Sequence, residues 1–210
     1  MKTVILCGGA IDDYGFCNDI LRSADCIICA DGGTRHAVNM NIIPNVIIGD
    51  LDSSKLGDIE YFRKKGVDII QYPVKKDKTD SHLCIEFAIP FSKEIILLVA
   101  TGSRIDHVLA NISLLKLGLN SNIPISIIDN HNDIRMINGS TVMKEKKGEV
   151  FSLIAFTEKV DGISTKGAYY ELHDASMEQG NPYGVSNCFK QDTVEISINS
   201  GVLLVIKSSD

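Results

Sequence analysis

Two aspartates stand one residue apart where a short apolar run ends, in GDLDS at 49–53. In an extended segment, residues two apart project to the same side, so Asp50 and Asp52 can share one hard cation. Mg²⁺ is the natural candidate, because it binds through a few carboxylates plus substrate phosphate oxygens. The alternative is that D-x-D-S caps a helix N-terminus. Asp80 and Asp106 lie near other predicted strand ends and favour the cation site.

Glycines and one arginine accompany these carboxylates at the predicted strand ends. Gly8-Gly9 and Gly32-Gly33 lack Cβ atoms, so their backbone N–H groups can approach a phosphate closely, although each pair also suits a tight turn. Arg104 stands at the start of a predicted helix, where free N–H groups favour anions. It is suited to clamp transferring phosphates, or to form a surface salt bridge with Asp106.

The common nucleotide-binding and hydrolase motifs are absent from the sequence. It contains no G-x-x-x-x-G-K-[ST], no G-x-G-x-x-G, no H-R-D and no G-x-S-x-G. Any phosphoryl chemistry therefore uses a scaffold outside the common kinase types.

Short apolar runs alternate with helical segments over the first two thirds of the chain. This pattern predicts a doubly wound, mostly parallel sheet with helices on both faces, and ligands then bind outside the carboxyl ends of the strands. Predicted helices cover 79–88 and 104–119, the second with Gly118 as a stop signal. The predicted strands are TVILCG, DCIICA, NVIIGD, VDIIQY, EIILLVA and ISIID.

The pattern changes after residue 133. Short alternating runs (EVFSLIAF, VEISIN and VLLVIK) punctuated by glycines predict an all-β domain, an antiparallel sandwich or barrel. We therefore expect an α/β nucleotide-binding catalytic domain over 1–133 and a β domain over 134–210, with the polar stretch DNHNDI at the boundary as a linker.

Composition narrows the class of protein. The 210 residues carry a net charge of -6, which argues against a nucleic-acid partner. No apolar stretch reaches the roughly 18 residues of a membrane helix, and we expect a cytoplasmic protein that does not contact a membrane. Its six cysteines are then reduced, and the C-x-x-C of Cys26 and Cys29 has no second pair to complete a zinc site.

Four motifs together resemble the thiamin pyrophosphokinase family. They are ADGG at 30–33, GDLDS at 49–53, KDKTD at 76–80 and GSRIDHVLAN at 102–111, in the family's order and spacing. In the β domain, TKGAYYEL at 165–172 and GVSN at 184–187 are similar to the family's thiamin-binding segments. The resemblance covers nearly the whole chain.

The resemblance implies transfer of the pyrophosphoryl group of ATP to the thiamin hydroxyl, giving thiamin pyrophosphate and AMP. It also implies Mg²⁺ and a homodimer in which each thiamin pocket is built from two chains. The alternatives are another Mg²⁺-dependent phosphoryl or nucleotidyl transferase, and a non-catalytic nucleotide- or thiamin-binding protein.

The family's functional residues map onto matching positions of this chain. The resemblance implies that Asp50, Asp52 and Asp80 are metal ligands and that these three, with Arg104 and Asp106, form the catalytic set. Nucleotide contacts come from Asp31, Gly32, Gly33, Thr101, Gly102, Ser103 and Arg104. Thiamin contacts come from Lys76, Thr79, Tyr170, Ser186 and Asn187. Asp80 and Asp106 are the alternative candidates to accept the proton of the thiamin hydroxyl, and the sequence does not decide between them.

The chain departs from the family pattern in three respects. Arg35 stands two residues after the ADGG turn, where family members usually carry Asn. There is no Trp, so the Trp that many members stack on thiamin is missing, and Tyr170 or Tyr183 is the candidate substitute. Residues 173–183 are also longer and more irregular than is usual in the family.

Overall fold

The computed structural model describes residues 1–11 and 13–209, and the chain forms two compact units, Met1–Asn130 and His131–Asp210. Within those described residues, no helix has the length and apolar character needed to cross a membrane.

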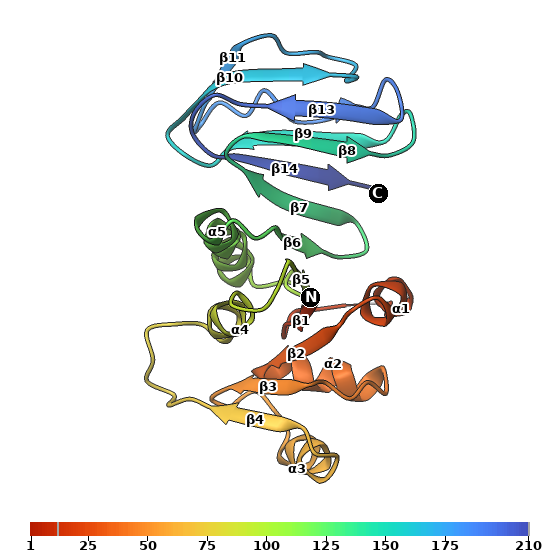
Figure 1. Cartoon of the computed structure of the whole chain (residues 1–210), viewed down its shortest axis with the longest axis vertical. Coiled ribbons are helices and arrows are strands. Elements are labelled where there is room, and N and C mark those ends of the chain that lie inside the picture. The colour runs from red at the N-terminus through yellow and green to blue at the C-terminus, as the bar shows by residue number, and fades with distance from the viewer. Residues whose placement is uncertain (12, 210) are drawn as a thin grey trace. The chain divides into compact units, whose positions relative to one another are not determined.

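The sheet of the N-terminal unit is parallel throughout, as the alternation of apolar runs predicts. Its strands lie side by side in the order β4-β3-β2-β1-β5-β6 (Figure 1). The order reverses between β1 and β5, so this sheet has the doubly wound topology. The strands are β1 (Lys2–Leu6), β2 (Cys26–Ala30), β3 (Val46–Gly49), β4 (Asp68–Gln71), β5 (Glu94–Leu98) and β6 (Ile125–Ile128).

Helices cover both faces of this sheet. One face packs side chains of α1, α2 and α3 against alternate strand residues such as Val4, Leu6 and Ile47 in one buried cluster. On the other face α4 lies against β1, β2 and β3, and α5 against β6. The helices are α1 (Gly15–Arg22), α2 (Thr34–Asn39), α3 (Leu56–Lys64), α4 (Asp80–Ala88) and α5 (Ile105–Ser121), and a 3-10 turn, η1 (Asp31–Gly33), precedes α2.

The two helices predicted by range are present, with one error at an end. Helix α4 begins where predicted, because the Thr79 hydroxyl accepts the backbone N–H of His82 as an N-cap. Gly118 does not stop α5, because the helix continues to Ser121. Its C-cap residue is Asn122, which has the left-handed conformation (φ 54°). Gly118 serves packing instead, because a Cβ there would lie 2.5 Å from the Ile123 carbonyl oxygen.

The C-terminal unit is an antiparallel β-sandwich, which decides between the two predicted architectures. One sheet has the order β12-β9-β14-β7, and a 4-stranded sheet has the order β11-β10-β13-β8. The strands are β7 (Asn132–Ile137), β8 (Ser140–Lys144), β9 (Val150–Ala155), β10 (Lys159–Lys166), β11 (Ala175–Glu178), β12 (Asn187–Cys188), β13 (Thr193–Ser197) and β14 (Leu203–Ser208).

The two sheets of this unit share one core. Alternate residues of both point inward, among them Phe151, Leu153, Val194 and Val205, all at most 1% exposed. The expectation of a linker in DNHNDI is wrong in its second half, because Asn132 already begins β7 and pairs with Ser208. The irregular segment 173–183 contains the short strand β11.

Candidate active site

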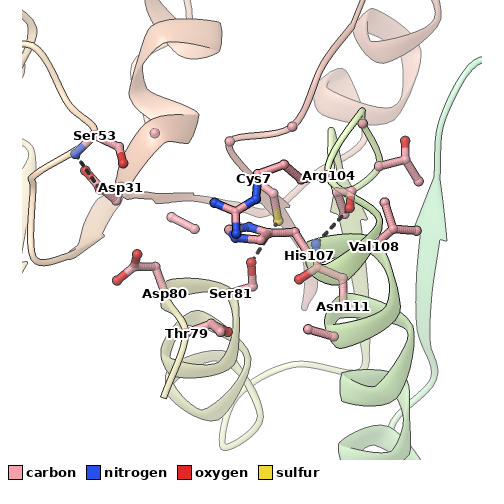
Figure 2. A pocket seen from close by; sticks show the side chains of 18 of the residues that line it. Cys7, Asp31, Ser53, Thr79, Asp80, Ser81, Arg104, His107, Val108 and Asn111 are labelled. Atoms are coloured by element: carbon pink, nitrogen blue, oxygen red, sulfur yellow. Dashed lines mark hydrogen bonds between the residues drawn. The ribbon is translucent and has the colours of Figure 1, made fainter. Parts of the chain in front are cut away.

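A pocket of about 530 Å³ lies at the carboxyl ends of the parallel strands in the N-terminal unit. Figure 2 shows Asp31 and Ser53 on one side of it, Asp80 and Ser81 on α4, and Arg104, His107 and Asn111 around α5. The predicted residues that line it are Asp31, Gly32, Lys76, Thr79, Asp80, Thr101, Gly102, Ser103 and Arg104. The predicted residues of this unit outside the lining are Gly33, Asp50, Asp52 and Asp106.

Three carboxylates form a cluster at this end of the sheet. Asp31, Asp50 and Asp52 each offer an oxygen, and these atoms lie within 4.8 Å of one another. The sequence suggested that strand alternation places Asp50 and Asp52 on the same side. Strand alternation is not the reason for their closeness. Strand β3 ends at Gly49 and Leu51 has φ 67°, so a turn brings the two side chains together. Oxygen ligands at this spacing suit a hard cation.

Asp31 is buried and fixed in place by the turn after β3. Its Oδ2 accepts the backbone N–H of Ser53 at 3.0 Å, and its Oδ1 accepts the Ser54 hydroxyl at 2.7 Å. These bonds compensate the burial of a residue that is only 2% exposed. Sequence reasoning placed Asp31 against the nucleotide and did not include it among the metal ligands.

Gly49 permits the close approach of the acidic residues. A Cβ at this position would lie 2.7 Å from the Asp31 Cβ and 3.0 Å from Asp80 Oδ1. Any larger residue would therefore push β3 away from η1 and α4. Packing against Asp31 and Asp80 therefore requires glycine at the position before the two aspartates of GDLDS.

Lys76 connects this cluster to α4. Its Nζ donates a short hydrogen bond to Asp50 Oδ2 and lies 3.2 Å from Asp80 Oδ1. Hydrogen bonding to Lys76 lowers the pKa of Asp50, whereas burial raises the pKa of Asp80. Asp80 Oδ1 is buried and accepts no hydrogen bond from the described residues. The ion pair with Lys76 therefore does not replace the hydrogen bonds that this oxygen would form with water.

The N-terminus of α5 presents an ion pair to solvent. Arg104 is the N-cap residue, and its Nη2 donates to Asp106 Oδ2 at 2.5 Å. This contact lowers the pKa of Asp106 to about 2. Both side chains are more than half exposed, so the pair is the surface salt bridge that the sequence offered as an alternative role. The Arg104 side chain is free to turn toward an anion in the pocket.

The turn that leads from β5 to α5 is held from two sides. The Thr101 hydroxyl donates to Asp129 Oδ2 at 2.8 Å, and the Asn111 side-chain amide donates to the Ala100 carbonyl at 2.7 Å. A Cβ on Gly102 would come within 3.0 Å of the Ala10 backbone N. The 101–103 turn therefore packs tightly against the loop after β1.

Sequence reasoning missed part of the pocket wall. The Arg35 guanidinium donates to the carbonyls of Gly8 and Gly9, at 2.7 and 2.6 Å, and so fixes the glycine loop after β1. Cys7 lines the pocket too, with Ser81 donating to its Sγ at 3.5 Å, and burial raises the pKa of this thiol to about 11. The departure at Arg35 was visible in the sequence; its partners were not.

The predicted thiamin residues of the C-terminal unit form a separate local structure. The Asn187 side chain is committed to the backbone: Oδ1 accepts the Tyr170 N–H at 3.0 Å and Nδ2 donates to the Tyr170 carbonyl at 2.8 Å. Ser186 has φ 60°, and its N–H donates to the Ser152 hydroxyl. Tyr170 is 66% exposed and stacks edge-on against Tyr169. Asn187 thus orients an exposed aromatic surface.

Two family descriptions match the chain. "Thiamin pyrophosphokinase, catalytic domain" matches residues 17–127, and "Thiamin pyrophosphokinase, vitamin B1 binding domain" matches residues 140–203. A thiamine pyrophosphokinase of Bacillus subtilis is 31% identical over 186 residues, which is 87% of each chain. Thiamine pyrophosphokinase 1 of Oryza sativa is 28% identical and aligns over 85% of this chain and 77% of its own.

Solved structures agree with these relatives. The crystal structure of the B. subtilis thiamine pyrophosphokinase superposes with a TM-score of 0.88 and 27% identity over 100% of both chains. That of the Geobacillus thermodenitrificans thiamin pyrophosphokinase gives 0.86 and 26%, over 100% of this chain and 98% of its own. Since the catalytic-domain match covers more than half of the sequence, this chain belongs to the thiamin pyrophosphokinase family.

Proposed function

We propose that the strand-end pocket is where this enzyme performs the family's reaction. A thiamine pyrophosphokinase transfers the pyrophosphoryl group of ATP to the hydroxyl of thiamin and releases AMP. The observation that supports this location is that Asp31, Asp80, Lys76 and Arg104 at the start of α5 line one pocket of about 530 Å³. Asp50 and Asp52 adjoin it through their contacts with Asp31 and Lys76. Positioning and charge neutralisation provide most of the catalysis in such transfers.

The carboxylate cluster fits Mg²⁺. Asp50 and Asp52 are the proposed ligands, and Asp31 is the third oxygen donor within 4.8 Å. Asp80 stays in the proposed set, because its buried Oδ1 accepts no hydrogen bond from the described residues and a cation would satisfy it. When bound, Mg²⁺ would neutralise phosphate charge next to the β-phosphorus.

The remaining walls suit the nucleotide. We propose that Asp31, Gly32, Gly33 and the turn 101–103 lie against ATP, with backbone N–H groups directed at its phosphates. Arg104 is exposed and, among the residues that the structure describes, its side chain is bound only to Asp106, so it can exchange that partner for a phosphate oxygen.

Asp80 is the better candidate for the base that accepts the thiamin proton. Burial raises its pKa, whereas the Arg104 contact lowers the pKa of Asp106 to about 2 and makes that carboxylate a weak base. The sequence left these two residues undecided. The proton would thus pass to a carboxylate that also belongs to the proposed metal-ligand set.

We place thiamin against Lys76 and Thr79 on the pocket side and against Tyr170, Ser186 and Asn187 in the C-terminal unit. Tyr170 offers an exposed ring for the thiamin cation. We further propose that residues 1–133 and 134–210 act as nucleotide and thiamin domains, and that two chains form a homodimer with shared pockets. Six unpaired thiols fit the reducing cytoplasm.

The bond that breaks gives a direct test. ATP labelled at the γ-phosphate should transfer its label to the thiamin product, with one AMP released per thiamin pyrophosphate. The physical reason is that attack at the β-phosphorus carries both outer phosphates to the acceptor. Thin-layer separation of labelled products, with nucleotides quantified by chromatography, measures both. Recovery of ADP with thiamin monophosphate would contradict the proposed attack at the β-phosphorus.

A further inference from the structure

Lys76 supplies the positive charge of the carboxylate cluster. Its Nζ is hydrogen-bonded to Asp50 Oδ2 and lies 3.2 Å from Asp80 Oδ1, with the Lys76 and Asp50 side chains 13% and 9% exposed. Within residues 1–11 and 13–209, no other lysine or arginine forms an ion pair with Asp31, Asp50, Asp52 or Asp80. Among the described residues, this one ammonium group is therefore the only cationic partner of the four carboxylates, and it contacts two of them, Asp50 and Asp80.

Asp50 belongs to two arrangements at once. Its carboxylate is part of the Asp31–Asp50–Asp52 cluster that fits a cation, and the same carboxylate holds Lys76. A Mg²⁺ ion would sit about 2.0–2.1 Å from a carboxylate oxygen. An ammonium on that carboxylate would then lie beside a divalent ion at a position largely shielded from water, where like charges repel strongly.

Lys76 has room to leave. It lies between the end of β4 at Gln71 and the start of α4 at Asp80, in a segment without helix or strand. Its side chain lines the pocket that we assign to the ATP phosphates. A lysine ammonium on a flexible four-carbon stem can move several ångströms without a change in the backbone.

We infer that Lys76 and the divalent cation compete for Asp50. In the metal-free protein the ammonium joins Asp50 to Asp80. When the cation binds, Lys76 turns to the polyphosphate of the nucleotide, at the point where the thiamin hydroxyl, which we place against the same side chain, must meet the β-phosphate. This inference rests on the metal site proposed above. It makes metal and nucleotide binding mutually supportive, because the phosphates accept the ammonium that the metal displaces.

Metal affinity in the absence of nucleotide tests the competition. Mn²⁺ alone, titrated calorimetrically, should bind Lys76→Met about tenfold more tightly than the wild type, which is within the range of typical coupling between sites. Lys75→Met is the matched control: Lys75 is exposed, lies outside the pocket lining, and its loss changes the net charge equally. Its affinity should stay within about twofold of wild type.

Labelling of the unmodified enzyme gives a second readout that does not depend on a variant. Acetic anhydride labelling followed by peptide mass spectrometry should find Lys76 protected in the metal-free protein, and Mg²⁺ alone should raise its labelling rate severalfold. Lys78, which pairs with Glu86, should not respond. A purely structural Lys76 would stay protected with the metal bound.

Two results would overturn the inference while leaving the metal site in place: Mn²⁺ binding to Lys76→Met that is no tighter than to Lys75→Met, or unchanged Lys76 labelling with the metal bound. Failure of Mn²⁺ to bind any of the three proteins would overturn the metal site itself and the inference with it. A separate assay of pyrophosphoryl transfer tests the proposed reaction itself, so its failure is distinguishable from failure of the competition or of the metal site.

Discussion

Asp52 is the member of the carboxylate cluster whose role is easiest to isolate, because no lysine or arginine among the described residues pairs with it. Asp52→Asn should lower turnover by at least about a hundredfold, the scale of losing a key electrostatic group. Its melting temperature should not fall, since neighbouring carboxylates repel one another without a cation. Kinetics and thermal melts on the same samples measure both.

Asp68→Asn is the control for Asp52, an exposed carboxylate at the start of β4 with the same change in charge. Turnover close to wild type in Asp52→Asn would remove Asp52 from the metal site. Asp50→Asn is less informative, because it also breaks the contact with Lys76 and leaves that ammonium facing Asp80 alone.

His36 makes the fold sensitive to acid. It is 4% exposed, its Nδ1 is 2.8 Å from the Tyr14 hydroxyl, and burial followed by the nearby Arg35 lowers its pKa. Below the unfolded pKa of about 6.5 the unfolded chain therefore binds a proton that the folded protein excludes. Stability is full above that pH and falls as the pH drops toward the folded pKa.

The His36→Gln variant tests this linkage. Urea denaturation at pH 7.5 and pH 5.5 should show the wild type losing up to about 1.4 kcal/mol per pH unit in this window, and the variant losing less. His173→Gln, at an exposed position, should keep the wild-type slope. Parallel slopes for wild type and His36→Gln would mean that His36 is not the responsible group.

At the scale of elements, a strand or helix could be predicted where its own residues carry the hydrophobic pattern of that element. The β-branched strands of the first sheet and helix α5 carry their pattern in their own residues. Helix α2 has six residues and no side-chain N-cap, so the local sequence contains no signal that predicts it. The contacts of Arg35, which lies in this helix, were therefore not predicted. Lys76 could not be placed either, since its partner Asp50 is 26 residues away.

Two helical glycines make opposite predictions. A Cβ on Gly57, in α3, meets nothing within 4 Å, so Gly57→Ala should stabilise the fold by about 0.5–1 kcal/mol through helix propensity and a less flexible unfolded chain. A Cβ on Gly118 would lie 2.5 Å from the Ile123 carbonyl oxygen and 2.7 Å from the Ile125 side chain. Gly118→Ala should destabilise by about 1–3 kcal/mol.

Denaturant midpoints of the two variants, measured beside the wild type, check this pair. Each variant is the control for the other, because both replace a helical glycine by alanine and differ only in what surrounds the new methyl group. A Gly118→Ala protein as stable as Gly57→Ala would contradict the packing role given to Gly118.

At the scale of the whole molecule, the thiamin side was the hardest to predict. Strands β11 and β12 have only four and two residues, and β10 is irregular between Val160 and Ile163, so their alternation is weak in sequence. The role of Asn187 depends on a hydrogen-bond pair across 17 residues. The chain has no Trp, and an exposed tyrosine as substitute for the family's stacking Trp stays a prediction.

Those tyrosines lead to the prediction about assembly. Tyr169 and Tyr170 are 64% and 66% exposed and pack edge-on, and Tyr183 and Val185 are each 48% exposed, so the C-terminal unit exposes large apolar side chains suited to burial in a homodimer. Sedimentation should give about twice the chain mass of 22.9 kDa. A stable, fully active monomer would contradict the shared pocket.

Complementation tests whether one pocket draws on two chains. Asp52→Asn removes a residue of the N-terminal unit, and Tyr170→Ala removes an exposed ring of the C-terminal unit. If each pocket combines these units from different chains, a dimer carrying one of each variant has one doubly damaged pocket and one intact pocket. Co-expression with two affinity tags and purification on both should give about half of the wild-type turnover. The singly mutated homodimers and a doubly tagged wild type are the controls, and if each chain completes its own pocket, the mixed dimer stays as inactive as those homodimers.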